Sequence, residues 1–351
     1  SLFAVKFFDS SAGDGRLLQT DGQGVQTLSG LSQSHALGEQ YQATGAYEAN
    51  LGGGRLRLNG LLSKRAPFEV DTTRRILLPK SALESEILSS TDDSSELGLR
   101  YDHPVSSASH MELVALRQTK TITFADKVIS GSGLEAFSQD SRSSENIFRA
   151  VLKGSPSPGF SWELGSEAAF NRLDNRLTYT INGKKIALPS ANVVVTEDRY
   201  EGISKANWSP AGAKWSIEGV VRQEFSKIAS RGDTNLSKTL SYTKPRLAAQ
   251  WNYRPDGQLR LRYEREVGQL RFTDFVATAA LKNGVVTAGN PDLEPEQAWV
   301  SELSSEQKIW GKGAVVVTAR HYALSNAIDR APVFTKTSII DAPANIGRGS
   351  K

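Results

Sequence analysis

The chain has 351 residues, of which 38% are hydrophobic, and 42 basic against 38 acidic residues give a net charge of +4. This length allows one large domain or two ordinary ones, and this apolar content argues against disorder of the whole chain. The small net charge gives no reason to expect a nucleic-acid partner. The absence of cysteine excludes disulfides, thiolate metal sites and a cysteine nucleophile. No stretch approaches about 18 consecutive apolar residues, which excludes a helical membrane span.

Segments of about ten residues with apolar side chains at alternate positions come in pairs, which predicts antiparallel β-hairpins. A short turn joins each pair, and a polar stretch of about 17 to 28 residues separates it from the next. The predicted turns are Leu51–Gly54, Pro104–Ala108, Gly154–Gly159, Ser209–Ala213, Arg254–Gln258 and Gly311–Gly313. The predicted strands are 38–50 with 55–65, 94–103 with 109–119, 144–154 with 159–172, 199–208 with 214–225, 243–253 with 259–272, and 298–310 with 314–325. Further strands before residue 38 would give about twelve to fourteen in all.

The clearest alternation begins at Leu259, with apolar side chains on one face of the predicted strand and charges on the other. The charged face consists of Arg260, Arg262, Glu264 and Glu266. A row of charges of mixed sign predicts a face that meets water. Arg265 falls on the apolar face, so we expect either a β-bulge at this residue or the end of the alternation at Glu264.

Short turns at one end of the strands and longer connections at the other are typical of up-and-down membrane barrels. The tryptophans add a second signal, because all but Trp299 lie within a few residues of a short turn. These five are Trp162, Trp208, Trp215, Trp251 and Trp310. Indole rings gather at membrane interfaces because the ring tolerates lipid while its N–H stays hydrated. We interpret the five as one interface girdle; the alternative is that tryptophan simply occupies strand ends in a soluble sandwich.

Some of the longer connections contain strand-like pieces of their own. Asn182-Gly183 lies between two such pieces and predicts a hairpin. Lys282-Asn283-Gly284 lies similarly between 276–281 and 285–287. These pieces also fit an alternative fold, a β-propeller with a repeat of about 50 residues. The only helical periodicity is one turn near Lys80–Leu88.

One segment is more specific than the strand pattern. It reads Gly289-Asn290-Pro291-Asp292-Leu293-Glu294-Pro295-Glu296. Its prolines fix φ and remove N–H donors, so the segment cannot join a β-ladder. Asn290 before Pro291 favours a turn, and the acidic side chains keep the segment solvated. We expect a structural role at a loop-to-strand boundary, with direct ligand contact as the alternative.

This segment, followed by Trp299 and Glu302, resembles the GNPxLxPE element in the barrels of TonB-dependent outer-membrane receptors. Ala314–Tyr322, then 327–329, and Asn345-Ile346-Gly347 are similar to the segments that follow it in that family. The resemblance implies an all-β fold, an antiparallel up-and-down transmembrane β-barrel with short periplasmic turns and long extracellular loops. It also implies that Arg260, Arg262, Glu264 and Glu266 face a lumen.

The family barrel has about 22 strands around a plugged lumen, so about twelve to fourteen would be an incomplete barrel. An open sheet leaves unpaired edges in lipid, which is not viable. We therefore expect residues 1–351 to be one partial barrel domain of a longer protein, with the plug domain and the C-terminal strands outside this chain.

The function implied by the resemblance is uptake of a scarce solute, such as a ferric siderophore, cobalamin or an oligosaccharide, across the bacterial outer membrane. The implied partners are the TonB complex, through an N-terminal region missing here, a small solute such as a metal chelate or oligosaccharide, and the lipid bilayer. Loops on rigid scaffolds usually carry recognition, so we expect the solute to meet 173–198, 226–242 and 273–297. The alternatives are a soluble β-propeller or β-sandwich binding module and a passive porin-like barrel.

No pattern in the chain predicts catalysis, a metal site or a cofactor. The histidines, His35, His103, His110 and His321, lack metal-ligand spacing. Gly-x-Ser-x-Gly is absent, and the charged strand faces are better interpreted as hydrated walls than as general acids. We expect no enzymatic activity and no cofactor.

Overall fold

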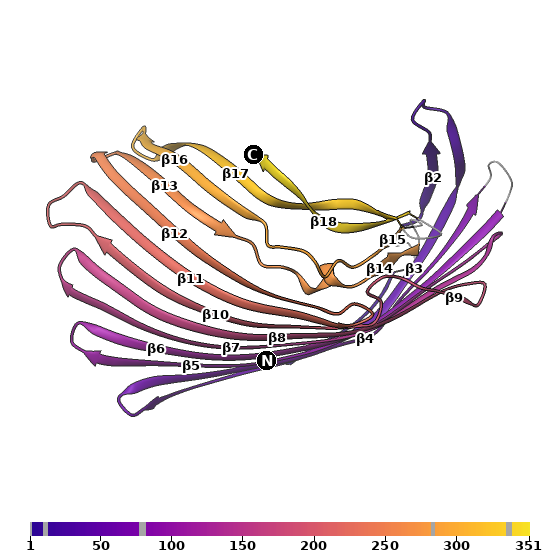
Figure 1. Ribbon diagram of the computed structural model, residues 1–351, viewed down its shortest axis with the longest axis horizontal. Helices are drawn as coiled ribbons and strands as arrows, with labels where there is room; N and C mark the ends of the chain where they lie inside the picture. Colours follow the sequence, from indigo (N-terminus) through magenta and orange to yellow (C-terminus); the bar gives the residue numbers. More distant parts are fainter. Residues whose placement is uncertain (1, 10–12, 77–81, 282–284, 335–338) are drawn as a thin grey trace.

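The computed structural model describes residues 2–9, 13–76, 82–281, 285–334 and 339–351. Most of these residues lie in one strongly curved sheet that forms an open trough (Figure 1). The long strands are β3 (Gln26–Leu51), β4 (Gly54–Ile76), β5 (Ala82–Ser106), β6 (Ser109–Ser130), β7 (Gly133–Ser157), β8 (Phe160–Ile181), β10 (Val193–Trp208), β11 (Trp215–Gly232), β12 (Leu236–Arg254), β13 (Gly257–Val267), β16 (Gln297–Ile309), β17 (Gly313–Phe334) and β18 (Ile339–Ser350). The shorter elements are β1 (Leu2–Asp9), β2 (Gly15–Thr20), β9 (Lys184–Ile186), the 3₁₀ turn η1 (Phe272–Phe275), β14 (Thr278–Ala280) and β15 (Val285–Thr287).

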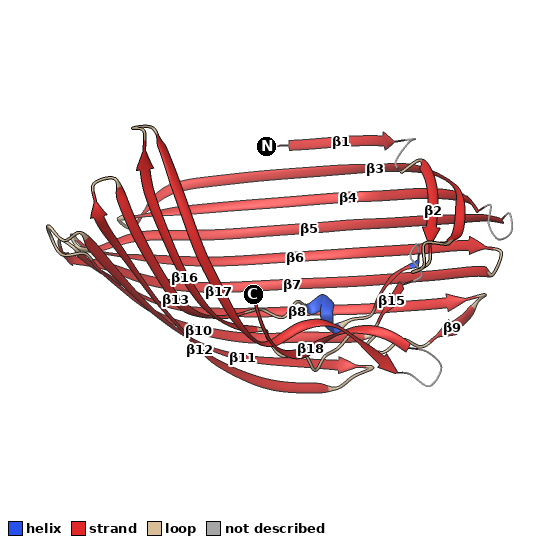
Figure 2. Cartoon of the chain, turned by 90° about the horizontal axis from the view of Figure 1, so that it is seen from above, coloured by secondary structure: helices blue, strands red, loops and turns tan. Residues whose placement is uncertain are grey.

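Each long strand pairs antiparallel with the next long strand of the chain, from β3 through to β18. Among the described residues, β1 pairs with β3 at one edge of the trough, and β18 pairs with the far half of β17 at the other. The two edges stay apart, so the trough is not a closed barrel (Figure 2). A propeller would divide these strands among separate blades, so one continuous meander excludes that alternative.

The six predicted short turns all join neighbouring strands at the same end of the trough (Figure 1). The β3–β4 turn shows why the sequence turns there. Gly52 and Gly53 have φ of 56° and 81°, a left-handed pair that glycine adopts freely and that a tight hairpin turn requires. The hairpins predicted from the sequence are therefore confirmed at this end.

At the far end the strands are longer than predicted. The stretch 120–143, expected as a polar connection, consists of β6 and β7 joined at Gly131 and Ser132. The expected loop 226–242 is the end of β11, a turn and the start of β12. In 173–198, β8 continues to Ile181, and only 187–192 lies outside the strands after β9. The long connections are thus mostly extended hairpins, and 268–296 is the one described connection that remains long.

The strand ends were missed because the two faces of each strand exchange polarity partway along. Near the short turn of β8, the apolar residues Phe160 and Leu164 lie on the convex face, where they are exposed. Farther along, Leu173 and Leu177 are buried on the concave face, while Arg172 is exposed on the convex face. The apolar residues thus move from even to odd positions along the strand. In the sequence this change looks like the end of the alternation, so the predicted strand stops there.

The connection 268–296, which we call the inward segment, causes this reversal by folding into the concave side (Figure 2). Phe275 and Val276 pack against Leu173, Val195 and Ile228 of the wall. A second cluster surrounds Ala277 and Leu281 of the inward segment and includes Phe137 of β7, Leu177 and Tyr179 of β8, and Leu188. Burial of each large apolar side chain contributes about 1.5–3 kcal/mol, so the two clusters hold the segment firmly.

Three smaller predictions have clear outcomes. The β13–β16 register runs without interruption from Gly257 to Val267, so the bulge at Arg265 is wrong and the alternation simply ends. The helical turn near Lys80–Leu88 is also wrong where it is described, because β5 begins at Ala82. The Asn182-Gly183 hairpin between β8 and β9 is confirmed, with φ of 50° and 76° at its two residues.

The turn predicted at Lys282-Asn283-Gly284 lies outside the described residues, although β14 and β15 on either side of it do pair. Among the described residues, no helix is both long and apolar enough to cross a membrane.

Candidate functional site: the concave face

The concave face near the short turns carries charged side chains that pair from strand to strand. In one run, Lys205 of β10 lies 2.6 Å from Glu218 of β11, whose other oxygen lies 3.6 Å from Arg246 of β12. Arg246 lies 3.6 Å from Glu264 of β13. The run continues through Arg262, Glu302 and Arg320. We call this run the charge ladder.

A second run of pairs crosses β5 to β8. Arg100 lies 3.0 Å from Asp102 on its own strand and 2.8 Å from Glu112 on β6. Lys153 of β7 lies between Glu112 and Glu163, at 3.6 and 3.9 Å. Single exposed pairs contribute only about 0–1 kcal/mol, so these networks explain little stability. What they produce is a wall of fixed, alternating charges that keeps the concave face hydrated.

The predicted charged face of β13 belongs to this wall. Arg260, Arg262, Glu264 and Glu266 all lie on the concave side, as their register with β12 and β16 requires. Arg262 bonds to Glu264 at 2.5 Å and to Glu302 at 3.0 Å, and Arg260 lies 3.7 Å from Glu306. The structure brings the four residues together, and their part in function stays a prediction.

Sequence reasoning missed the pairing of Lys244 with two acids. Its ammonium group lies between Glu201 of β10 and Glu224 of β11, and all three side chains are largely buried. Nearby, Arg199 bonds to Glu167 at 3.1 Å. The charges at alternate positions of β10 are visible in the sequence. Their partners lie on β11 and β12, and the sequence does not show which residues of neighbouring strands lie opposite each other.

Two cavities open on the concave face. One, of about 540 Å³, is lined by Lys205, Lys244, Glu264 and Glu296 among others. The other, of about 390 Å³, lies between the wall and the inward segment, where Phe272 faces Gln118, Asn171 and Glu197. Polar and charged groups around a space of this size can hold a polar solute by hydrogen bonds. Within the described part of the chain, no three His, Asp or Glu side chains are placed to hold a metal ion.

The predicted segment Gly289–Glu296 ends the inward segment and is bonded on several sides. The Asn290 N–H donates to the carbonyl of Asp274 at 2.9 Å, and its side-chain amide donates to the carbonyl of Pro343 at 2.9 Å. The Asp292 N–H donates to the Asn290 side-chain oxygen at 2.9 Å, which closes the turn expected before Pro291. Leu293 is fully buried.

Asn345 of β18 joins this segment to two strands. Its side-chain oxygen accepts from the Glu294 N–H at 2.9 Å, and its amide donates to the carbonyls of Glu294 and Asn326 at 2.8 and 2.9 Å. The Asn326 amide donates back to the Glu294 carboxylate at 2.8 Å, and Glu296 accepts from the Ile328 N–H at 3.2 Å. We call these contacts the Asn345 clamp. They support a structural role for the segment, while a ligand role stays an untested alternative.

Two ionisable groups near the inward segment have shifted pKa values. Burial raises the pKa of Asp126 of β6, whose Oδ2 accepts from the Leu281 N–H at 3.3 Å. Burial lowers the pKa of Lys238 of β12, against the opposing effect of Asp292 and Glu294, and its ammonium group donates to the Leu293 carbonyl. Neither residue was singled out in the sequence, because each acquires its role only when the inward segment folds over it.

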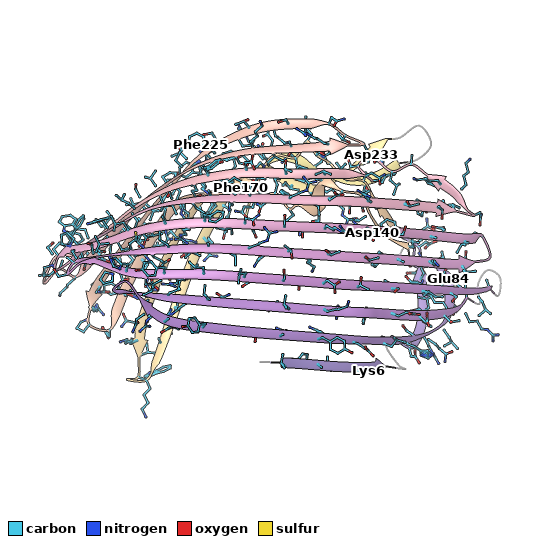
Figure 3. All side chains as sticks on the ribbon, turned by 90° about the horizontal axis from the view of Figure 1, so that it is seen from below. Lys6, Glu84, Asp140, Phe170, Phe225 and Asp233 are labelled. Atoms are coloured by element: carbon cyan, nitrogen blue, oxygen red, sulfur yellow. The ribbon has the colours of Figure 1, made fainter. Side chains whose placement is uncertain are left out.

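The convex face near the short turns carries exposed apolar residues. On β11 these run from Ile217 through Val221 to Phe225, and Phe225 is visible on this face in Figure 3. At about 3.3 Å per residue this stretch is about 26 Å long, comparable with the apolar band of a membrane barrel.

The tryptophans expected at a membrane interface border this apolar surface. Trp162, Trp208, Trp215 and Trp251 lie on convex positions beside short turns, and Trp310 lies in the β16–β17 turn with 93% of its surface exposed. The rings of Trp208 and Trp215 meet edge to face with centroids 5.0 Å apart. Their role at a membrane interface stays a prediction.

A family model described as TonB dependent receptor-like, beta-barrel, matches residues 18–350. The chain belongs to this family. TonB-dependent receptors are transporters of the bacterial outer membrane and are not enzymes. No curated protein matches the chain.

Solved structures show the same fold for this receptor barrel. The hemophore receptor HasR of Serratia marcescens is 12% identical, with a TM-score of 0.55 over 99% of this chain and 59% of that one. The ferric-catecholate import receptor Fiu of E. coli K12 is 10% identical, with a TM-score of 0.56 over 99% and 60%. The siderophore receptor PiuA of Acinetobacter baumannii is 10% identical, with a TM-score of 0.55 over 99% of this chain and 60% of that one. The chain thus spans about 60% of the length of these receptors.

Proposed function

We propose that this chain is the barrel portion of an outer-membrane receptor that imports a scarce solute with energy from the TonB system. One observation carries the proposal, namely a wall with a hydrated charge ladder on its concave face and an exposed apolar band on its convex face, in a member of the receptor family. A barrel wall between lipid and a wet lumen requires this arrangement, whereas a soluble sheet buries its apolar face.

The scarce solute we propose is a metal chelate such as a ferric siderophore, or alternatively cobalamin or an oligosaccharide. The two concave cavities, with their charged and amide side chains, suit a polar solute of this kind. The similar receptors are a hemophore receptor in complex with its hemophore and heme, a ferric-catecholate import receptor and a siderophore receptor. The predicted recognition loop 273–297 packs on the wall through Phe275 and Val276, and Phe272, directly before it, lines a cavity.

We further propose that additional strands complete the wall and that a plug domain carries the contact with TonB. Two observations support this. Among the described strands, none pairs with the outer side of β1, and β18 has only a one-residue bridge to β15 beyond its pairing with β17; open edges are not tolerated in lipid. The chain also covers only part of the length of the receptors that it resembles.

The test is uptake by cells that lack the complete receptor gene and carry it again on a plasmid. Radiolabelled ferric siderophores, cobalamin and an oligosaccharide are offered one at a time, in strains with and without TonB. We expect one of them to accumulate only when both the receptor and TonB are present. Accumulation that is unchanged without TonB would establish the passive porin instead. An empty plasmid and a Lys312→Met receptor, altered at an exposed turn residue, serve as negative and positive controls.

A further inference from the structure

The convex face has several hollows, and one of them lies at mid-height across β7, β8 and β10. This outer groove has a volume of about 680 Å³. Its floor consists of small residues, and large apolar residues form its rim. The floor residues are Ala150 of β7, Ser166 and Ala168 of β8 and Gly202 of β10; the rim residues are Phe148, Tyr200 and Phe225.

Strand register explains why the groove forms. Ala150, Ser166 and Gly202 lie side by side on three neighbouring strands. In the next row, Ala168 lies between Phe148 and Tyr200. Strands are about 4.8 Å apart, so the floor is roughly 10 Å wide, enough for an alkyl chain and too narrow for a second sheet. The rim side chains are all about half exposed, so nothing else in the described chain covers the groove.

Beyond the groove, toward the far end of the strands, the convex face becomes basic. Arg117 of β6, Arg142 of β7, Arg172 of β8 and Lys227 of β11 are all exposed on this face, and we call them the outer basic patch. Arg142 is paired in register with Asp174, two residues from Arg172. The Cα atoms of Arg142 and Arg172 are therefore about 8 Å apart, close enough for both side chains to reach one phosphate.

These cations are poorly neutralised by the protein. Of the carboxylates in the described residues, none lies within 4 Å of Arg117, Arg142 or Lys227, and Arg172 has only Asp174 at 3.8 Å. Arg117 donates instead to the Asn146 side-chain oxygen at 3.1 Å. The acidic groups that face the patch are Asp140, two residues before Arg142, Asp174, which also lies 3.7 Å from Arg176, and Asp198. On the concave face, by contrast, the charge ladder pairs its cations with acids, so the excess of positive charge is a property of this outer surface.

We propose that the outer groove and the outer basic patch together bind an anionic lipid of the outer leaflet, with an acyl chain in the groove and a phosphate on the patch. The inference rests on the proposed outer-membrane location. The groove lies within the apolar band, where only acyl chains can fill it, and the patch lies just beyond the band, at headgroup height. Guanidinium groups bind phosphate in a two-pronged geometry, which suits Arg142 and Arg172. The outer-leaflet lipid with this chemistry is the phosphorylated, acylated disaccharide lipid A.

The charge half of the proposal is tested with the complete receptor in zwitterionic detergent, titrated with purified lipid A and measured by native mass spectrometry. The variant is Arg142→Gln with Arg172→Gln. The matched control is Arg75→Gln with Arg330→Gln, exposed arginines outside the patch. Each basic group near an anionic lipid surface contributes roughly fivefold in affinity, so we expect binding about 25-fold weaker in the variant and unchanged in the control. Equal binding by the variant, or equal losses in both, would overturn the proposal.

Acyl-chain binding in the outer groove is tested by filling the groove at one glycine and substituting a matched glycine elsewhere on the convex face. An added side chain on Gly202 would meet no atom within 4 Å of its Cβ, so Gly202→Leu fills the groove without strain. Gly45 of β3 is also open, faces the same way and lies at a similar height outside the groove. We expect Gly202→Leu to weaken lipid A binding at least about fivefold and Gly45→Leu to leave it unchanged. Unchanged binding by Gly202→Leu would show that the groove does not hold the chain.

Heat-modifiable gel mobility shows whether each variant is a folded barrel. A receptor that never inserts into the membrane contradicts the proposed function itself. A receptor that inserts and imports its solute, but binds lipid A no better than zwitterionic phospholipid, contradicts only the lipid site.

Discussion

Replacing Asn345 by alanine should release the end of the inward segment while leaving the wall intact. The Asn345 side chain makes three hydrogen bonds, two with the Glu294 backbone and one with the Asn326 carbonyl. Alanine removes all three and leaves the Glu294 N–H without its partner. The residues of the charge ladder are not touched by this change.

The magnitude follows from the exposure of those bonds. A typical intramolecular hydrogen bond contributes about 0.5–1.5 kcal/mol, and a bond that water can replace lies at the lower end. The two bonds to Glu294 are exposed and the one to Asn326 is partly buried. We therefore expect local opening to become easier by about 1–3 kcal/mol, which raises the population of the open state by about five- to 150-fold.

Amide hydrogen exchange of the complete receptor in detergent measures this directly. Protection at the Glu294 and Ile328 amides should fall by that factor, because both amides bond within the Asn345 clamp. Asn50→Ala, at an exposed asparagine of β3, is the control and should change neither amide. Unaltered exchange at Glu294 in Asn345→Ala would refute the clamp as the anchor of the inward segment.

Three further changes probe the same architecture. Gly289→Ala should detach the inward segment, because the added Cβ would lie 2.3 Å from the Phe275 carbonyl oxygen. Limited proteolysis should then cut the chain near 275–288. A segment that stays uncut would contradict this close packing at Gly289. The raised pKa of Asp126 means that this carboxyl holds its proton more tightly when the inward segment is docked, so docking of the segment should strengthen as pH falls through that pKa towards the ordinary value of 3.8. In Asp126→Asn, docking of the segment, measured by hydrogen exchange, should no longer depend on pH. A pH profile that is the same in the variant would exclude this carboxyl as the cause. Lys244→Met leaves Glu201 and Glu224 facing each other without their cation, so it should lower the free energy of unfolding by about 3–5 kcal/mol. Adding Glu224→Gln should restore part of that stability. An unchanged unfolding midpoint in urea would rule out this ion triad as a stabilising contact.

The strands near the short turns can be predicted from the sequence because each face of a strand has uniform surroundings there. In the proposed barrel wall, lipid on one face and water on the other impose a clean period of two, as in Leu259, Leu261 and Tyr263 against Arg260 and Arg262. The turn residues add a local signal, as at Gly52 and Gly53, where the backbone needs a positive φ. Neither signal depends on distant parts of the chain.

The far half is not readable in this way because its partner is the chain itself. Leu173 and Ile228 are apolar on the concave face only because Phe275, far along the sequence, packs on them. The ion triad of Lys244 likewise needs three strands in register. The Gly289–Glu296 segment was recognisable as a unit, yet its bonds to Asn345 and Lys238 arise only in the folded structure.

The two-faced wall is tested most directly by scanning single cysteines along β11, since the chain has no cysteine of its own. Each cysteine from 217 to 231 in the complete, membrane-inserted receptor carries a spin label, and its accessibility to oxygen and to a water-soluble nickel chelate is measured. Convex positions such as Gly219 and Val221 should meet lipid, concave positions such as Glu218 and Arg222 should meet water, and lipid contact should end beyond Phe225. Equal accessibility on both faces, or lipid contact at Glu218 and Arg222, would contradict a barrel wall between lipid and a water-filled lumen.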